Sequence, residues 1–314
     1  MSRIHEALQR AYLERGRMPM LSDFQVAEPE SMAQDNPSPA VMEPPPLVDA
    51  ELGIDSIAQH PWEPVQASFP TLADRGAGVE QFRALRSHVY QARYEAPLKS
   101  ILIASGLPSE GKSFVAANLA MSLARNSIHK ILLIDGDLRR PSLHTLLGAP
   151  NSVGLADYLE GSADVHDILQ RNRDHSKNGE QNSKGIANLA LIPSGKSADH
   201  STELVAGERM KELIRSVSPY FDWIIIDAPP VLAVTDAVEI SRAADAVMLV
   251  ARGGQTTYDV AQRTQSAFGN SRILGFVLND VKNVPNLGTY RYGNYYGTDS
   301  DAGGQMKRGR DNGR

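Results

Sequence analysis

The sequence predicts an α/β fold in which a parallel sheet is covered by helices on both faces. Two observations lead to this expectation. Short, almost unbroken apolar segments alternate with longer stretches of helical periodicity, and several apolar segments run directly into glycine or aspartate. Strands of a parallel sheet are buried on both faces and therefore appear as continuous apolar runs, whereas half-exposed antiparallel strands alternate between apolar and polar residues.

The individual elements follow from these patterns in chain order. The expected strands span residues 101–104, 131–134, 189–192, 223–226, 246–250 and 273–278. The expected helices span residues 79–93, 112–126, 203–217, 236–243 and 257–268. Because crossovers between parallel strands are right-handed, the loops that follow these strands should meet at one edge of the sheet, where ligands bind in such folds.

The segment after the first strand carries the most specific motif. It reads G-L-P-S-E-G-K-S, which matches the phosphate-loop pattern, and it has the strand before it and the helix after it that this motif requires. Backbone N–H groups and the helix N-terminus would bind phosphate, with Lys112 on the outer phosphates and the Ser113 hydroxyl on Mg²⁺. A chance glycine-rich turn would need neither flank. We therefore expect a P-loop NTPase-type domain whose nucleotide contacts are Gly106, Leu107, Pro108, Ser109, Glu110, Gly111, Lys112, Ser113 and Phe114.

Aspartates end two further strands of the expected sheet. Asp135 and Asp137 follow one strand and Asp227 follows another, so all three should lie at the edge that holds the phosphate loop. Carboxylates there can hold Mg²⁺, directly or through its waters, and one can accept a proton from an attacking hydroxyl. An isolated strand-end aspartate is more often a cap or turn residue. The combination predicts metal-organising roles for Asp135 and Asp227 beside Ser113, and a catalytic base in Asp137.

Composition excludes several classes of function. The chain has 314 residues, of which 41% are hydrophobic, so one large core or two small ones can form. Its net charge of −5 gives no global basic field for nucleic acid. The absence of cysteine excludes disulfides and thiolate metal sites. No apolar run reaches the roughly 18 residues of a membrane span, and no apolar signal region opens the chain, so we expect a cytoplasmic protein.

Changes in composition divide the chain into four expected parts. Residues 1–20 form an amphipathic helix or a frayed terminus, and residues 21–77 form a proline-rich linker. The phosphate-loop domain spans residues 78–284 and includes a polar surface loop at 171–185. Residues 285–314, rich in Gly, Asn and Asp, form a tail that cannot bury a core.

These motifs together resemble the bacterial tyrosine kinases (BY-kinases) of capsule and exopolysaccharide synthesis. The resemblance covers about residues 78–296. Its nucleotide-site motifs are Gly106–Ser113 as Walker A, Ile131–Asp137 followed by Leu-Arg-Arg-Pro as Walker A′, and Ile224–Asp227 followed by Ala-Pro-Pro as Walker B. Outside that site, a Glu-x-x-Arg-x-x-Arg pattern on the first expected helix and a cluster of tyrosines in the tail also match.

The resemblance implies a protein-tyrosine kinase that uses ATP and Mg²⁺ and phosphorylates its own tail in trans within a ring-like homo-oligomer. The residues it implicates are Tyr290, Tyr292, Tyr295 and Tyr296 as phosphorylated, Glu80, Arg83 and Arg86 as the oligomer interface, and Asn279 as an adenine contact. The implied partners are a membrane polysaccharide co-polymerase (Wzz-like) as activator and a tyrosine phosphatase, which place the chain at the inner face of the plasma membrane. From the residues alone, an ordinary solvated helix face is the favoured interpretation of the Glu80, Arg83 and Arg86 set. A strand-ending turn residue is the alternative for Asn279, and an idle terminus is as good an account of the tail tyrosines as phosphorylation.

Departures from the family pattern define the alternatives. No membrane-spanning module precedes the expected kinase domain, which resembles a split arrangement activated by a separate membrane protein. The helix at 203–217 lacks the Asn-Pro that often precedes it in the family. Leu107 stands where positioning ATPases of the MinD/ParA type carry a second lysine, which disfavours that class as the first alternative. The second alternative is a non-catalytic, nucleotide-sensing scaffold for the membrane co-polymerase.

Overall fold

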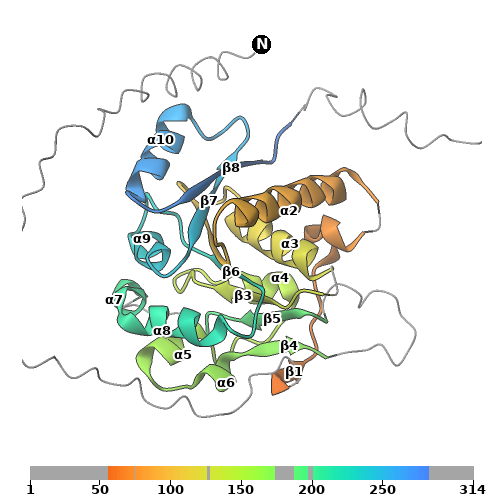
Figure 1. The fold of residues 1–314 in the computed structure, drawn as a ribbon, viewed down its shortest axis with the longest axis vertical. Coiled ribbons are helices and arrows are strands. Elements are labelled where there is room, and N and C mark those ends of the chain that lie inside the picture. The colour runs from red at the N-terminus through yellow and green to blue at the C-terminus, as the bar shows by residue number, and fades with distance from the viewer. Residues whose placement is uncertain (1–55, 74, 126–127, 174–186, 197–200, 283–314) are drawn as a thin grey trace, which may run out of the picture. The chain divides into compact units, whose positions relative to one another are not determined.

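An eight-stranded sheet forms the centre of the computed structural model, which describes residues 56–282 apart from 74, 126–127, 174–186 and 197–200. The spatial order of the strands is β1-β4-β5-β3-β6-β2-β7-β8 (Figure 1). All adjacent pairs are parallel except β4 and β5, which are antiparallel. The strands are β1 (Ala58–His60), β2 (Ser100–Ser105), β3 (Ile131–Asp135), β4 (Gln170–Asn172), β5 (Leu189–Ile192), β6 (Trp223–Asp227), β7 (Ala246–Arg252) and β8 (Ile273–Asn279).

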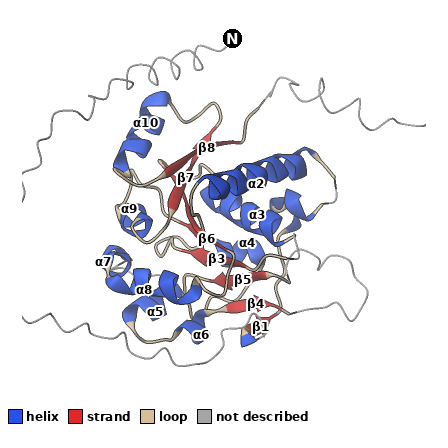
Figure 2. Cartoon of the chain, in the orientation of Figure 1, coloured by secondary structure: helices blue, strands red, loops and turns tan. Residues whose placement is uncertain are grey.

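Helices cover both faces of this sheet (Figure 2), as the sequence predicts. One face is covered by α2, α3 and α4, and the other by α5 and the helices from α7 to α10 (Figure 1). The helices are α2 (Ala77–Glu95), α3 (Lys112–Ala124), α4 (Leu143–Leu147), α5 (Leu155–Glu160), α6 (Val165–Ile168), α7 (Ser201–Ala206), α8 (Glu208–Val217), α9 (Asp236–Ser241) and α10 (Tyr258–Ala267), with short 3₁₀ turns η2 (Gln66–Ser68) and η3 (Pro70–Leu72).

The two faces of the sheet build two separate hydrophobic cores. Along β2, Ile101 and Ile103 belong to the core under α2 and α3, whereas Leu102 and Ala104 belong to the core on the opposite face. This division follows from the alternation of side chains along a strand. Every residue of α3 from Val115 to Ala124 is buried, because this helix lies between the sheet and α2. A helix that is apolar on all sides is expected only in such a position.

The expected linker 21–77 extends too far toward the C-terminus. Residues 56–73 belong to the folded domain, since β1 pairs with β4 and the side chains of Trp62 and Phe69 are buried. The Trp62 backbone N–H donates to Asn172 Oδ1 at 2.9 Å, and its indole N–H donates to Gln170 Oε1 at 3.4 Å. The sequence did not reveal this because prolines break the local periodicity of the segment. Its position is fixed instead by contacts with residues more than a hundred positions away in the chain.

Other differences concern short elements. The expected strands and helices are all present, but the helix expected at 203–217 is divided into α7 and α8 at Gly207. The sequence does not predict the three-residue strands β1 and β4 or the short helices α4 to α6, because helices of fewer than two turns and strands of three residues carry almost no periodic signal. Part of the expected surface loop 171–185 belongs to β4.

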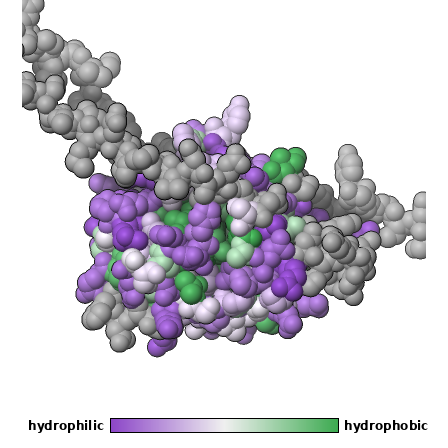
Figure 3. All heavy atoms as spheres, turned by 90° about the horizontal axis from the view of Figure 1, so that it is seen from below, coloured by the Kyte–Doolittle hydropathy of each residue, from purple (hydrophilic) through white to green (hydrophobic). Residues whose placement is uncertain are grey.

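Several expectations lie outside the described residues. These are the helix and most of the linker within 1–55, the remainder of the polar loop at 174–185, and the tail with its four tyrosines. Within the described ranges, no helix combines the length and apolar character needed to cross a membrane. The face drawn in Figure 3 is largely hydrophilic, with its exposed apolar residues in small spots.

Candidate active site at the carboxyl edge of the sheet

The phosphate loop joins β2 to α3 in the conformation its sequence predicts. Gly111 has a φ of 92° and is the N-cap residue of α3, a left-handed conformation that favours glycine. A Cβ atom at Gly111 would lie 1.9 Å from Asn279 Nδ2, so the close approach of β8 also excludes a side chain there. Ser109 has a φ of 63°, which is uncommon for a residue other than glycine. Together these turns place the N-terminus of α3 at the carboxyl edge of the sheet.

A buried carboxylate holds the loop from its far side. Glu110 is 3% exposed, and its Oε2 accepts from the Leu107 backbone N–H at 2.7 Å. Its Oε1 accepts from the Thr256 hydroxyl, and Thr256 Oγ1 in turn accepts from the Arg252 backbone N–H at 2.8 Å. The Asn279 side-chain amide donates to the Glu110 carbonyl at 3.0 Å. The loop conformation is therefore fixed by the ends of β7 and β8.

The guanidinium of Arg252 also links the phosphate loop to the end of β8. Its Nε and Nη2 donate to Asp280 Oδ2 at 2.9 and 2.7 Å, and its Nη1 donates to the Ser109 carbonyl at 3.4 Å. We call Glu110, Thr256, Arg252 and Asp280 the brace. Sequence analysis assigned no role to Thr256, Arg252 or Asp280. The signal that could have found them is weak, because polar residues directly after strands at this edge are common in any fold of this class.

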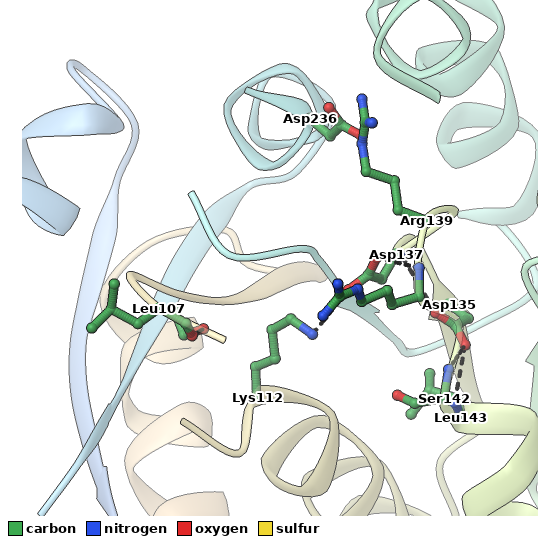
Figure 4. Close-up of polar contacts among 10 residues, drawn as sticks. Leu107, Lys112, Asp135, Asp137, Arg139, Ser142, Leu143 and Asp236 are labelled. Carbon is green, nitrogen blue, oxygen red and sulfur yellow. Dashed lines mark hydrogen bonds and ion pairs between the residues drawn. The ribbon is translucent and has the colours of Figure 1, made fainter. Parts of the chain in front are cut away.

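On the other side of the loop, Lys112 pairs with Asp137. Lys112 Nζ lies 3.1 Å from Asp137 Oδ2, and the two side chains are 14% and 4% exposed. Burial lowers the pKa of Lys112, but the negative charges of Asp227, Asp137 and Asp135 outweigh it and leave the pKa raised. Figure 4 shows Lys112 pointing at Asp137, whereas Leu107 lies apart from this pair. The lysine is thus charged and held ready for an anion.

The Asp135 carboxylate accepts hydrogen bonds from nearby backbone N–H groups. Its Oδ2 accepts from the N–H groups of Ser142 and Leu143 at 3.0 and 2.9 Å, and its Oδ1 accepts from the Asp137 N–H at 3.3 Å. Burial, together with the charge of Asp227, raises its pKa to about 7, although the Leu143 and Ser142 hydrogen bonds oppose this. Asp135 therefore fixes the start of α4 and positions Asp137 (Figure 4).

Asp227 differs from its neighbours. It lies directly beside Asp135 in the register of β3 and β6, is fully buried, and has no hydrogen-bond partner for either carboxylate oxygen among the residues the structure describes. Burial raises its pKa to about 6, while the charge of Lys112 and the Ser113 hydroxyl act in the opposite direction. The nearby Lys112 charge and Ser113 hydroxyl offset part of the cost of burying this carboxylate, but its oxygens accept no hydrogen bond from the described residues. This arrangement fits a cation between Asp227 and Ser113.

The donor set resembles that of a magnesium site. Across the described part of the chain, no group of three or more His, Cys, Asp or Glu side chains is arranged to hold a metal ion by itself. Mg²⁺ usually binds one or two carboxylates and completes its shell with waters and substrate phosphates. Asp227 and the Ser113 hydroxyl would supply such a partial set, with Asp135 beside them.

The carboxylate of Asp236 orients Arg139, which lies two positions after Asp137 in the chain. Asp236, at the start of α9, is 1% exposed and accepts from the hydroxyls of Ser201 and Thr202 at 2.8 and 2.6 Å. Its Oδ2 also accepts from Arg139 Nε at 3.2 Å. Burial raises the pKa of Asp236, but the hydroxyls and Arg139 outweigh it and leave the pKa lowered. Figure 4 shows Arg139 extended away from Lys112 toward Asp236.

Lys112, Asp137 and Arg139 line a cavity of ≈ 510 Å³. Its lining comes from the phosphate loop, the segment after β3 and the segment after β6. The residues that line it are Pro108, Ser109, Gly111, Lys112, Ser113, Phe114, Asp137, Arg139, Arg140, Ser142, Pro229, Pro230, Ala233 and Val234. Cationic side chains and the phosphate loop thus meet the Asp137 carboxylate around one cavity, at the edge where ligands bind in this class of fold.

The structure brings most of the predicted site residues together, but not all. Asn279 lies against the phosphate loop, where its amide contacts Glu110. Glu80, Arg83 and Arg86 lie on α2, and Glu80 pairs with Arg83 at 2.5 Å. Their role at an oligomer interface stays a prediction, as do the ligand roles of the loop, the aspartates and Asn279. The four tail tyrosines lie outside the described residues.

Fold and site together define a nucleotide-binding α/β domain of the P-loop type. A family model described as an AAA domain matches residues 99–261. The tyrosine-protein kinase YwqD of Bacillus subtilis is 34% identical over 221 residues, which cover 70% of this chain and 86% of that protein. The tyrosine-protein kinase ptk of Acinetobacter johnsonii is 31% identical over 250 residues, which cover 75% of this chain but only 32% of that protein.

Solved structures agree with these relatives. The kinase domain of the Escherichia coli tyrosine kinase ETK is 33% identical, with a TM-score of 0.57, over 65% of this chain and 75% of that chain. The chimerical protein CapA2B2 is 27% identical, with a TM-score of 0.62, over 72% of this chain and 93% of that chain. The chain belongs to the bacterial tyrosine kinase family.

Proposed function

We propose that the chain is an ATP-dependent protein-tyrosine kinase that transfers the γ-phosphoryl group of ATP to tyrosines of its own C-terminal tail. The observation that supports this most directly is that the phosphate loop and the Lys112–Asp137 ion pair line one cavity. The buried carboxylate of Asp227 lies close enough to Lys112 for their charges to interact. A loop that only capped a helix would need none of the charged groups around it.

The residues divide the chemistry between them. The loop N–H groups and Lys112 bind and orient the phosphates, and the N-terminus of α3 adds its positive dipole. Asp227 and Ser113 would hold Mg²⁺, which neutralises charge on the phosphates when bound. Asp137, whose side chain is 4% exposed and whose backbone N–H donates to Asp135, would accept the proton of an incoming tyrosine hydroxyl. Phosphoryl transfer needs little more than such positioning and charge neutralisation.

The acceptors we propose are Tyr290, Tyr292, Tyr295 and Tyr296, supplied in trans by another copy of the chain in a ring-like homo-oligomer. Glu80, Arg83 and Arg86 would contribute to the contact between copies. In this proposal the kinase regulates exopolysaccharide or capsule polymerisation and export, a membrane co-polymerase activates it at the inner face of the plasma membrane, and a tyrosine phosphatase resets it. The family resemblance supports these roles.

Incubation with Mg·ATP followed by detection of phosphotyrosine tests the reaction. We expect labelled tyrosine in the wild type, none in Lys112→Met, and almost none when all four tail tyrosines are changed to Phe. Full labelling of Lys112→Met would contradict the assignment of Lys112. ATP hydrolysis with no phosphotyrosine would favour a positioning ATPase, and ATP binding without either reaction would favour a scaffold.

A mixing experiment tests transfer in trans. Lys112→Met keeps its tail but lacks the phosphate clamp, whereas the four-Phe variant keeps the clamp but lacks acceptors. We expect phosphotyrosine on the Lys112→Met chain only when the two variants are combined. Labelling that never appears in the mixture, although the wild type is labelled, would show that each chain phosphorylates itself.

A further inference from the structure

One side of the candidate active-site cavity is apolar. Four of the residues that line it come from the segment that follows β6 and carry no polar side chain: Pro229, Pro230, Ala233 and Val234. We call these four residues the apolar wall. The same cavity is lined by Lys112 and Asp137, so charged groups and an apolar surface border one space. Ligand cavities commonly combine a few polar groups with an apolar surface that binds the rest of the ligand.

Backbone hydrogen bonds fix the apolar wall against the phosphate loop. The N–H groups of Val231 and Leu232 donate to the carbonyls of Ser105 and Gly106 at 2.9 and 3.2 Å. The Pro230 carbonyl closes a turn by accepting from the N–H groups three and four positions later, at 3.1 and 3.2 Å. Proline also fixes its own φ angle. The wall is therefore set in place before a ligand arrives, which lowers the entropic cost of binding.

The nucleotide of the proposed reaction does not account for the apolar wall. Its phosphates need N–H donors and cations, which the phosphate loop and Lys112 supply. Its base is expected at Asn279, whose amide donates to the Glu110 carbonyl, and neither of these two residues lines the cavity. An apolar surface offers nothing to a phosphate. The wall is therefore available for a different chemical group.

Two exposed leucines lie beside the wall and the phosphate loop. Leu107 and Leu232 are each 40% exposed, and the Leu232 N–H donates to the carbonyl of Gly106, the residue before Leu107. Exposed apolar side chains next to an active site favour contact with a polypeptide, since a small polar substrate gains nothing from them. The surroundings of the cavity thus agree with an acceptor that is part of a protein chain.

We propose that the apolar wall binds the aromatic ring of the acceptor tyrosine and thereby selects tyrosine over serine and threonine. A tyrosine has a large apolar ring and one polar hydroxyl, so it is buried most favourably where an apolar surface lies next to a polar partner. The wall and Asp137 provide these two features around one cavity. Serine and threonine carry a hydroxyl but no ring for the wall to bind. This inference rests on the proposed kinase function and adds the residues that determine its specificity.

Peptide binding tests the recognition of the ring without requiring catalysis. The protein is the full chain with its four tail tyrosines changed to Ala, so that no ring of its own tail competes. The probes are fluorescent peptides of residues 285–300 with tyrosine, phenylalanine or alanine at the four acceptor positions, titrated with Mg²⁺ and a non-hydrolysable ATP analogue present. Fluorescence anisotropy gives each Kd. We expect the tyrosine and phenylalanine peptides to agree within about threefold, and the alanine peptide to bind about tenfold more weakly.

Matched variants locate the ring on the wall. Val234→Ala removes apolar contact area and should weaken the tyrosine peptide about fivefold. Ala233→Leu changes an exposed residue of the wall, fills the space in front of it and should weaken the same peptide about tenfold. Both variants should keep the Kd of the ATP analogue within about twofold. The control is Val153→Ala, which truncates a valine that is 39% exposed and lies outside this cavity, and it should change neither Kd.

The outcomes distinguish this inference from the kinase proposal itself. If the wall variants weaken the ATP analogue and not the peptide, the wall holds adenine and the inference is wrong. An alanine peptide that binds as tightly as the tyrosine peptide would also overturn it, even if the wild type forms phosphotyrosine. Ring-dependent binding that the wall variants weaken, in a chain that never forms phosphotyrosine, would support the wall as an aromatic site and contradict only the kinase reaction.

Discussion

The phosphate loop has charged residues on both of its sides, but their hydrogen bonding differs. On one side the charged groups are paired, and on the other side buried carboxylates are crowded together. On the side of β7 and β8, the brace pairs Glu110 with the Leu107 N–H and the Thr256 hydroxyl, and pairs Arg252 with Asp280. On the side of β3 and β6, which we call the acidic side, Asp135, Asp137 and Asp227 lie around Lys112. Here the Asp227 oxygens accept no hydrogen bond from the described residues, and the pKa values of Asp135 and Asp227 are raised.

This difference separates the residues that hold the loop in shape from those proposed to bind the cation and phosphates. A buried polar group that is fully paired contributes to stability, whereas a buried charge without a partner costs stability and persists only where a ligand needs it. The brace therefore determines the shape of the loop, and the acidic side is incomplete until a cation and phosphates arrive. Substitutions on the two sides should consequently have opposite effects on stability.

The largest expected effect is that of Asp227→Asn. Removal of the buried charge should stabilise the ligand-free protein by about 3 kcal/mol at neutral pH, because the pKa rises from 3.8 to about 6 and one pKa unit corresponds to about 1.4 kcal/mol. The same change should lower kcat by about 10³-fold, since an electrostatic group at the reacting phosphates is lost. Thermal unfolding and phosphotyrosine formation measure the two effects. A variant that is both active and unchanged in stability would remove the basis of the comparison.

Glu110→Ala tests the brace and should do the reverse. It leaves the Leu107 N–H and the Thr256 hydroxyl without their acceptor, so the free energy of unfolding should fall by about 2 kcal/mol. The Kd for ATP should rise about tenfold, because the loop is no longer held in its binding shape, while kcat at saturating ATP changes little. Chemical denaturation and nucleotide titration report the two quantities.

Glu110→Gln is the control for this prediction. Its amide oxygen can still accept from the Leu107 N–H, and its amide nitrogen can donate to Thr256 Oγ1, so most of the binding should be recovered. Identical losses in Glu110→Ala and Glu110→Gln would show that the charge of Glu110 matters rather than its hydrogen bonds. That result would place Glu110 with the acidic side.

The pH dependence of stability sharpens the contrast. The folded pKa values of Asp135 and Asp227, about 7 and about 6, lie above the ordinary value of 3.8. Between these limits the native state holds protons that the unfolded chain has released, so stability should decrease as pH rises from about 4 to about 7. Urea unfolding across this range measures the slope. In Asp227→Asn the slope should be smaller, whereas Glu110→Gln should keep it.

Asp236→Asn should have the smallest effect of these changes. The variant keeps an acceptor for Arg139 but loses the charge, so we expect a loss of about 1 kcal/mol in stability and a change in kcat below about threefold. Because the pKa of Asp236 is lowered in the folded state, the wild-type advantage should be present above the ordinary pKa of 3.8 and disappear as pH falls through the lowered value. Parallel unfolding curves at neutral and acidic pH test this, and an equal difference at both would contradict it.

Local sequence determined the strand–loop–helix around Gly111, the strand-end aspartates and the six adjacent strands from β5 to the edge strand β8. These features depend on neighbouring residues, since periodicity and glycine conformation act over a few positions. The tertiary structure decided which of those residues meet. The Thr256 hydroxyl contacts Glu110 across 146 positions, and Trp62 reaches Gln170 across 108.

The roles of individual side chains were also decided by tertiary contacts. A pattern of three strand-end aspartates cannot show that Asp135 accepts hydrogen bonds from the start of α4 while Asp227 accepts none from the part of the chain that the structure describes. Both aspartates sit at equivalent positions of paired strands. The two aspartates differ because the start of α4 lies against the end of β3 and supplies N–H donors to Asp135 alone. They are neighbours only because β3 and β6, which are far apart in the chain, are adjacent in the sheet. The meeting of the apolar wall with Asp137 at one cavity likewise required β3 and β6 to be neighbours in the sheet.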